Sequence, residues 1–317
     1  MTKRILVTGA SGFFGRHLVP SLVGHGYSVR ALTRRPLKLG ASVEVLSVGD
    51  INQDIDWTRH IDGMDSVVHL AALAHASSKT PDTAYDEINR GLTVRLAKAA
   101  AATGARFIFM SSVAAQTGSS ASAILTENSR PSPMSAYGRS KLRAEQEIAA
   151  ITNNYTVLRP ALTYGYGAKG NMGRIIKLAT FRLAPPFGSI RNRRSLLAIE
   201  NMCEAVNFVL NSDTTRGQVF ILSDPEPTSL ADIIYLLRSG AGLRPARISV
   251  PPVLLETVLR LLGRGDLWMK MGGDLITSSA KLQSFGFKWI TNTAEAMPKL
   301  GAWYARNVSA VSGMETG

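Results

Sequence analysis

A glycine-rich turn stands near the start of the chain, between a strand pattern and a helix pattern. Residues 4–8 are apolar and β-branched without polar alternation, which predicts a buried strand. The turn Gly9-Ala10-Ser11-Gly12-Phe13-Phe14-Gly15 follows, and apolar residues then recur at helical spacing over 18–23. A glycine turn between a strand and a helix is the setting of a dinucleotide-binding site in an α/β fold.

The three glycines of this turn have separate predicted roles. Gly9 permits the tight turn, Gly12 lets a pyrophosphate approach the backbone, and Gly15 lets the helix pack close to the strand. The N–H groups and the positive end of the helix would then face the phosphates. The spacing is Gly-x-x-Gly-x-x-Gly rather than the commoner Gly-x-Gly-x-x-Gly, so a glycine turn without a ligand is the alternative.

The end of the second predicted strand indicates which dinucleotide would bind. Residues 28–33 have a strand pattern, and Arg34 and Arg35 follow with no carboxylate beside them. An acid at this place binds the ribose 2′-hydroxyl of NAD, whereas arginine suits the 2′-phosphate of NADP. NADP(H) is therefore predicted as the cofactor. NAD(H) is the alternative if the two arginines are only solvated.

A tyrosine and a lysine form the second motif. Tyr137 and Lys141 are four residues apart, so a helix places them on one face, and Glu145 and Ile148 continue that helix. A free tyrosine has a pKa of about 10, and lowering it by about 3 units takes roughly 4 kcal/mol. An exposed ion pair supplies only about 0–1 kcal/mol. We therefore expect a partly buried site in which Lys141 acts together with an oxidised, cationic nicotinamide. A chance pair on a helix surface is the alternative.

A further strand pattern brings a hydroxyl to the same place. Residues 106–110 are apolar and lead into Ser111 and Ser112. Ligands of open α/β sheets bind at the carboxyl ends of the strands, so Ser112, the Tyr–Lys pair and the glycine turn should share one crevice.

Together these motifs resemble the extended short-chain dehydrogenase/reductase family, in its nucleotide-sugar epimerase/dehydratase/reductase branch, from Lys3 to about Trp303. The resemblance implies that Ser112, Tyr137 and Lys141 are catalytic. It also implies a cofactor site formed by Gly9, Ser11, Gly12, Phe13, Phe14, Gly15, Arg34, Arg35, Asp50, Ile51, Leu70, Ala71, Ala72, Asn89, Tyr137, Lys141 and Pro160. The implied substrate contacts are His75, Ser112, Asn171 and Arg194, with Arg194 on the diphosphate of a UDP-sugar. A structural histidine at 75 and an exposed basic turn at 193–194 are the alternatives.

Departures from the family pattern narrow the expected reaction. A 4,6-dehydratase has an Asp-Glu pair after the strand-end hydroxyl, and this chain has Val113-Ala114-Ala115 there. The chain most resembles the 4-ketoreductases of surface-polysaccharide synthesis, so we predict NADP(H)-dependent reduction of the 4-keto group of a UDP-linked, 6-deoxy, N-acetylated sugar. The alternatives are a UDP-hexose 4-epimerase with tightly bound NAD and, more remotely, a non-catalytic NAD(P)-sensing protein.

Composition bounds the remaining possibilities. The 317 residues contain one cysteine, carry a net charge of +13 and show no signal-peptide pattern or apolar run of membrane-span length. We therefore expect a cytoplasmic protein without an integral membrane segment. The basic residues are scattered and match no nucleic-acid-binding module. A solvated basic surface, attraction of anionic substrate and cofactor, and loose contact with an anionic membrane all fit the charge. No metal site is predicted.

The predicted fold is an α/β, Rossmann-type doubly wound parallel sheet with a smaller C-terminal substrate-binding subdomain. The dinucleotide-binding domain is expected over 1–165, with 195–224 returning to it and a strand at 219–222. The nucleotide-sugar subdomain is expected over 166–194 and 225–305, and a frayed tail over 306–317. An amphipathic helix over 253–262 is expected to bury its apolar stripe in the core, with membrane contact as the alternative. A homodimer through the helices at 92–102 and 137–150 is expected by resemblance only.

Overall fold

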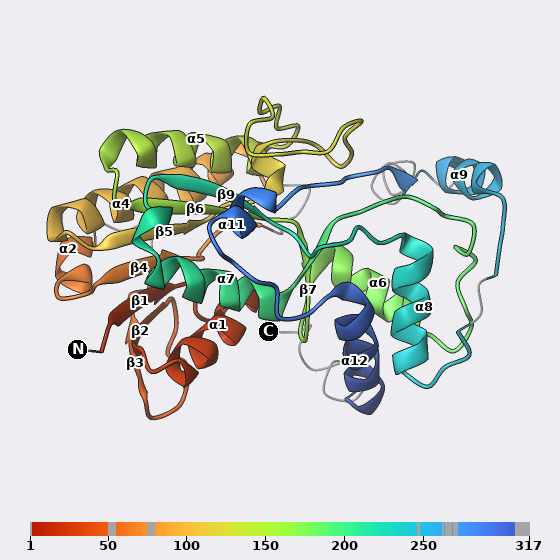
Figure 1. Cartoon of the computed structure of the whole chain (residues 1–317), viewed down its shortest axis with the longest axis horizontal. Helices are drawn as coiled ribbons and strands as arrows, with labels where there is room; N and C mark the ends of the chain where they lie inside the picture. The colour runs from red at the N-terminus through yellow and green to blue at the C-terminus, as the bar shows by residue number, and fades with distance from the viewer. Residues whose placement is uncertain are drawn as a thin grey trace.

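Parallel strands and covering helices alternate through the N-terminal half of the chain (Figure 1). The computed structural model describes residues 2–49, 55–74, 80–245, 248–261, 263, 268 and 272–307, and within them it forms a seven-stranded parallel sheet of order β3-β2-β1-β4-β5-β6-β9. The strands are β1 (Arg4–Thr8), β2 (Ser28–Thr33), β3 (Val43–Ser47), β4 (Ser66–His69), β5 (Arg106–Met110), β6 (Tyr155–Pro160) and β9 (Gln218–Leu222). The predicted doubly wound fold and the strand at 219–222 are confirmed.

Helices cover both faces of this sheet because its strands are apolar on both sides. One face packs on α1 (Phe13–Gly24), α7 (Ile199–Asn211) and α11 (Ala280–Ser284). The other packs on α2 (Trp57–Ile61), α4 (Leu92–Thr103) and α5 (Ala136–Ile151). The strand order reverses between β1 and β4, and in such sheets the crevice beyond the strand ends at this point is the ligand site.

A smaller helical cap lies beyond the carboxyl ends of the strands (Figure 1). It contains a two-stranded sheet of β7 (Leu162–Tyr164) and β8 (Leu196–Ala198) with α6 (Gly170–Thr180), α8 (Leu230–Gly240), α9 (Pro252–Leu261) and α12 (Thr293–Arg306). Its core contains Tyr164, Ile176, Leu237 and Leu300. Buried Arg238 closes this core by donating hydrogen bonds to the carbonyl oxygens of Ala179, Phe181 and Arg244.

The expectation that α9 buries apolar side chains in the core is met in part among the residues that the structure describes, and the side chains at 258, 259 and 262 lie outside them. Val253, Leu254 and Leu261 are 71%, 56% and 83% exposed, whereas Leu255 packs against the cap core. Sequence periodicity shows that a helix has an apolar face, but it does not show whether other parts of the fold cover that face. Among the described residues, no helix has both the length and the hydropathy needed to cross a bilayer. The tail was predicted over 306–317, but Arg306 is the last residue of α12, and residues 308–317 lie outside the described residues.

Candidate active site

The glycine turn is packed so tightly that side chains would not fit. Gly9 has φ +71°, and a Cβ on it would lie 2.7 Å from the Ala71 backbone nitrogen in the loop after β4. A Cβ on Gly15 would lie 2.4 Å from the Gly9 carbonyl oxygen. Gly12 is the N-cap of α1 and no side chain caps this helix end. An uncapped helix N-terminus beside a bare backbone turn fits a dinucleotide pyrophosphate.

Gly15→Ala should weaken binding of the dinucleotide by about 10-fold or more and lower the melting temperature, because overpacking costs about 1–3 kcal/mol and shifts the turn. Gly24→Ala is the matched control, since nothing lies within 4 Å of a Cβ at that end of α1. Titration of cofactor fluorescence measures the first effect and thermal unfolding the second. Equal affinities in both variants would contradict the role given to the turn.

The end of β2 presents the two arginines to solvent. Arg34 and Arg35 are exposed, and in the part of the chain that the structure describes neither side chain makes an ion pair or a hydrogen bond. They are therefore available to a phosphate at this edge of the crevice. Asp50, Ile51 and His75, predicted to contact the adenine and the sugar, lie outside the described residues.

Tyr137 lies in the first turn of α5. The Ser135 hydroxyl caps this helix by accepting a hydrogen bond from Gly138 N at 3.0 Å, which fixes the helix start beside the end of β5. Burial raises the pKa of Tyr137 to about 12, and a hydrogen bond with Ser112 partly offsets the rise. The structure thus brings Ser112 and Tyr137 together, but the pKa of Tyr137 is raised and not lowered as the sequence argument expected, because burial outweighs the hydrogen bond with Ser112.

Close packing sets the distance between α5 and the Ser112 loop. A Cβ on Gly138 would lie 2.1 Å from the Ala114 carbonyl oxygen in the short 3₁₀ helix Val113–Ala115. Sequence reasoning gave Gly138 no role, although a glycine inside a helix costs about 1 kcal/mol and so signals a packing reason. The residues that replace the dehydratase Asp-Glu pair therefore form the backbone surface on which α5 rests.

Lys141 is fully buried one turn beyond Tyr137. Its ammonium donates a hydrogen bond to the Met110 carbonyl oxygen at 2.8 Å and lies 4.5 Å from the centre of the Phe109 ring. Burial lowers the pKa of Lys141 to about 7, and the nearby Glu145 charge opposes this. Lys141 is consequently held at the end of β5 as a group that titrates near neutrality.

A buried network behind Lys141 joins three elements. The Glu145 carboxylate of α5 accepts hydrogen bonds from Arg159 Nε of β6 at 3.0 and 3.2 Å and from the Ser111 hydroxyl after β5. Both charged side chains are about 5% exposed. Sequence reasoning missed this network. Its signal was a Glu one turn after Lys141 together with an Arg inside an apolar strand.

Asn89 supports the loop that lines the crevice. This buried residue lies in a π-helix (Asp86–Gly91), and its amide binds both backbone groups of Leu73 and the hydroxyl of Ser140 on α5. The loop with Leu70, Ala71 and Ala72 is therefore fixed against the glycine turn. Asn89, predicted to line the cofactor site, contacts the loop that lines the crevice in the part of the chain that the structure describes.

His69, at the end of β4, is buried between the hydroxyls of Thr8 and Thr93 at 2.7 and 2.9 Å. Burial, and secondarily the charge of Lys141, lowers the pKa of His69 to about 3, so the imidazole is neutral. It aligns β1 and β4 at the crevice and does not transfer protons.

Asn171 and Arg194, two of the predicted substrate residues, lie in the cap. Asn171 is exposed in the first turn of α6. Pro160, predicted to contact the cofactor, is buried at the end of β6 in the main sheet. Arg194 precedes β8, and its guanidinium donates to the carbonyl oxygens of Ser119 at 3.1 Å and Gly273 at 2.9 Å. Burial lowers the pKa of Arg194. The Arg194 side chain thus joins the 117–120 loop to the cap.

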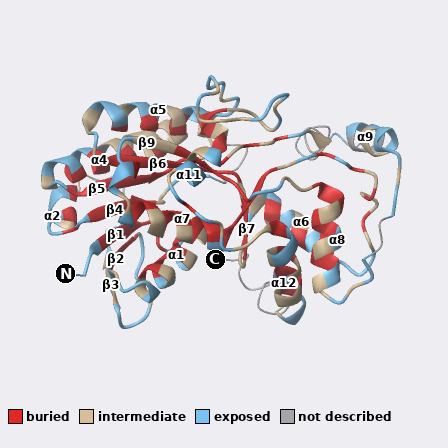
Figure 2. Cartoon of the chain, viewed as in Figure 1, coloured by how far each residue is buried: buried red, intermediate tan, exposed pale blue. Residues whose placement is uncertain are grey.

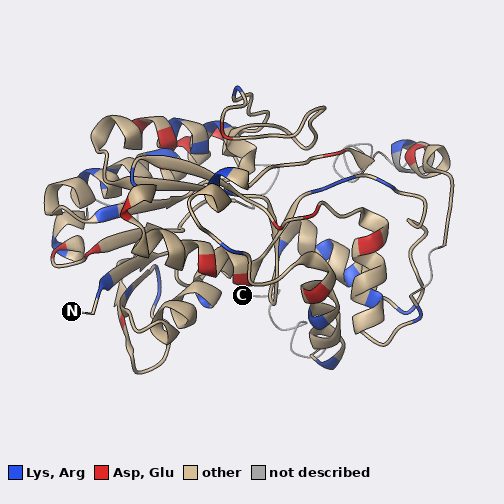
Figure 3. Cartoon of the chain, viewed as in Figure 1, with Lys and Arg blue, Asp and Glu red and all other residues tan. Residues whose placement is uncertain are grey.

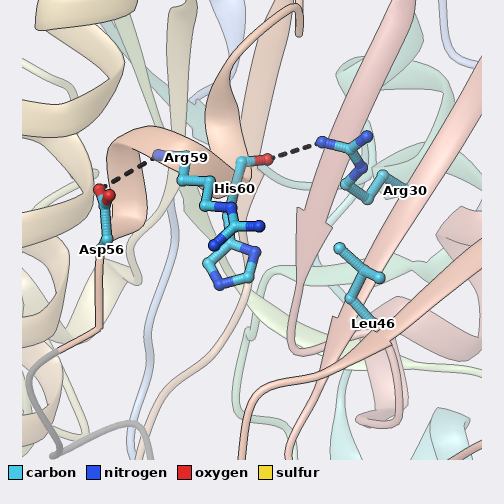
Figure 4. A pocket seen from close by; sticks show the side chains of 5 residues that line it. All are labelled: Arg30, Leu46, Asp56, Arg59 and His60. Carbon is cyan, nitrogen blue, oxygen red and sulfur yellow. Dashed lines mark hydrogen bonds between the residues drawn. The ribbon is translucent and has the colours of Figure 1, made fainter.

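One open pocket lies away from these residues. Figure 4 shows it between β2, β3 and α2, where Arg30 donates to the His60 carbonyl oxygen and Leu46, Asp56 and Arg59 complete the lining. None of the predicted catalytic residues lines it, so we do not assign it to the reaction.

Comparison with known proteins agrees with the geometry. The family described as "NAD dependent epimerase/dehydratase family" matches residues 5–222. A UDP-glucose 4-epimerase of Vibrio cholerae is 31% identical over 300 residues, which cover 91% of each chain. An N-acetyl-α-D-glucosaminyl-diphospho-ditrans,octacis-undecaprenol 4-epimerase of Escherichia coli O157:H7 is 24% identical, over 90% of this chain and 86% of the other.

A solved structure extends this likeness over the cap as well. The structure of MoeE5 in complex with UDP-glucuronic acid and NAD has a TM-score of 0.76 and 26% identity, covering 96% of this chain and 99% of the other. With a glycine turn, a strand-end serine and a Tyr–Lys helix at one crevice, this chain belongs to the NAD dependent epimerase/dehydratase family and is an NAD(P)-dependent enzyme.

Proposed function

We propose that this enzyme uses NADPH to reduce the 4-keto group of a UDP-linked, 6-deoxy, N-acetylated sugar. The observation that carries the proposal is the position of the Tyr137 phenol, hydrogen-bonded to Ser112 beyond the end of β5. Reduction of a ketone needs a proton donor at the developing alkoxide, and the Tyr137 phenol carries a proton at neutral pH, although its raised pKa makes it a weak acid until a nearby cation lowers that pKa. Exposed Arg34 and Arg35 support NADPH, and the Val113-Ala114 backbone supports a reaction without dehydration.

Each residue has a defined part in this proposal. Ser112 holds the carbonyl oxygen and Tyr137 donates the proton to it. Lys141 binds the nicotinamide ribose, and its charge favours departure of the Tyr137 proton. Bound NADPH supplies the hydride, and the backbone at Gly9, Gly12 and Gly15 would hold its pyrophosphate.

The cap would hold the UDP-sugar. We assign residues 166–194 and 225–305 to this role, with Asn171 and Arg194 on the diphosphate. Arg194 would exchange its two carbonyl acceptors for phosphate oxygens, which suit a guanidinium better because they are charged.

A UDP-hexose 4-epimerase is the second candidate. The relative from Vibrio cholerae bears that name and covers nearly the whole chain. An epimerase uses Tyr137 first as a base and keeps its cofactor, whereas a reductase consumes one NADPH for each product. Purified enzyme incubated with NADPH and a UDP-4-keto-6-deoxy-HexNAc should oxidise cofactor in a 1:1 ratio with product. If the purified enzyme contains bound NAD and consumes no added cofactor, it is the epimerase. If it shows neither reductase nor epimerase activity, a sensing protein is favoured.

The cofactor preference has its own test. Arg34→Ala/Arg35→Ala should raise the KM for NADPH by about 10-fold or more and leave the KM for NADH within about 2-fold, because only NADPH carries the 2′-phosphate. Lys98→Ala, an exposed cation on α4, is the control and should change neither constant. Equal changes for both cofactors would refute 2′-phosphate recognition.

A further inference from the structure

An exposed apolar and basic surface runs along the outer edge of the cap. Six of the eleven large apolar side chains that stand exposed in the described residues belong to it. We call this surface the cap rim; its apolar members are Phe181, Leu183, Ile248, Val253, Leu254 and Leu261. Isolated exposed apolar side chains are normal, but a gathering on one edge marks an interaction surface.

The rim is one surface although its residues come from two separate segments. Gly188 N donates to the Ile248 carbonyl oxygen at 2.9 Å, and Phe187 bridges to Ser249. Buried Arg238 ties Phe181 and Arg244 together through their carbonyl oxygens. Helix α9 continues from this edge and lies at the outer end of the cap (Figure 1), and Figure 2 shows it mostly exposed. The two segments are therefore joined along one edge of the cap, and both carry exposed apolar side chains.

The charge along this edge has one sign. Between 181 and 193 the sequence contains no acid, and between 242 and 261 it contains only Glu256. The rim also contains four exposed arginines, Arg182, Arg191, Arg244 and Arg260. Of these four, only Arg260 forms an ion pair within the described residues, with Glu256 at 2.6 Å. Figure 3 shows both blue and red on α5, at the opposite end of the molecule from α9.

The combination points to one kind of partner. We propose that the cap rim docks on an anionic lipid surface, with the apolar side chains in the headgroup boundary and the arginines on lipid phosphates. Interfacial helices carry apolar side chains beside Lys and Arg in this way. A second copy of the chain would bring two basic rims together, and a net charge of +13 opposes that. Nucleic-acid interfaces are far more polar than this edge.

Co-sedimentation of the full chain with vesicles tests the proposal. Phosphatidylcholine vesicles containing about one-third phosphatidylglycerol should bind it at about 0.1 M salt, and pure phosphatidylcholine should bind much less. Leu254→Asp/Leu261→Asp should lower the partition coefficient by about 10-fold or more. Arg182→Ala/Arg244→Ala should lower it by roughly 5-fold for each arginine removed.

Matched controls separate docking from damage to the fold. Ile290→Asp changes a side chain that is 60% exposed outside the rim, close to the 56% of Leu254, and should bind vesicles as the wild type does. Thermal unfolding and NADPH affinity should be unchanged in all variants. Failure of the wild type to bind anionic vesicles would overturn the proposal, and so would full binding by the Leu254→Asp/Leu261→Asp variant. If light scattering shows a dimer that only this variant loses, the rim binds a second copy and the proposal is wrong.

Discussion

A Tyr137→Phe enzyme is expected to lose about 100-fold or more in the rate of hydride transfer. Positioned proton transfer contributes about 10²–10⁴-fold, and phenylalanine keeps the ring while removing the hydroxyl that is paired with Ser112. The raised pKa of Tyr137, about 12, means that the wild-type phenol carries its proton at neutral pH, so the variant lacks the donor itself. Single-turnover measurement with NADPH and the keto-sugar reports this step directly.

The controls for this variant address binding and fold. NADPH affinity should stay within about 3-fold of the wild type, because the glycine turn and Lys141 are intact. A loss of affinity together with the loss of rate would instead indicate that α5 is misplaced. Tyr85→Phe, in the helix Asp82–Tyr85, removes a hydroxyl outside the site and should leave the rate unchanged. A Tyr137→Phe enzyme that keeps more than a few per cent of the rate would exclude Tyr137 as the proton donor.

Local patterns predicted the elements that hold the site. Three short motifs carry this information: the apolar run before Gly9, the helical spacing of Tyr137 and Lys141, and the strand before Ser112. Each spans only a few consecutive residues, which is the range over which periodicity and turn chemistry act. β1, α5 and β5 form as expected, and Ser112 meets Tyr137.

Contacts between distant segments could not be predicted in this way. Arg159 meets Glu145 only because β6 lies beside β5 under α5, and Arg194 reaches Ser119 and Gly273 across 75 and 79 residues of chain. The described apolar side chains of α9 are the converse case, since Leu254 and Leu261 are exposed whereas Leu255 packs against the cap core. The apolar pattern of α9 is the same whether a partner covers it or not, so only the tertiary arrangement decides its environment.

Loss of the buried carboxylate should have the largest effect on stability. Glu145→Ala leaves the Arg159 guanidinium buried without its partner, which should lower the free energy of unfolding by about 3–5 kcal/mol. Chemical denaturation measures this loss. The double variant Glu145→Leu/Arg159→Met removes both charges and should recover most of the stability, because two apolar side chains need no pairing. A double variant as unstable as Glu145→Ala would show that the pair is not the cause.

Glu145→Gln tests whether the same carboxylate also acts on Lys141. The amide keeps the volume and can still accept from Ser111, but it removes the charge that opposes the burial-induced fall in the pKa of Lys141. That pKa is about 7 in the wild type, so it should drop further in the variant. In our proposal Lys141 holds the nicotinamide ribose as a cation, so kcat/KM for NADPH should fall as pH rises through this pKa, and the variant should begin its fall at a lower pH. Arg159→Lys keeps the charge balance and should leave the profile closer to that of the wild type. If the alkaline limb of the pH profile is unchanged in Glu145→Gln, Glu145 has only a structural role. Loss of a structural ion pair would destabilise the enzyme without moving the titration of Lys141.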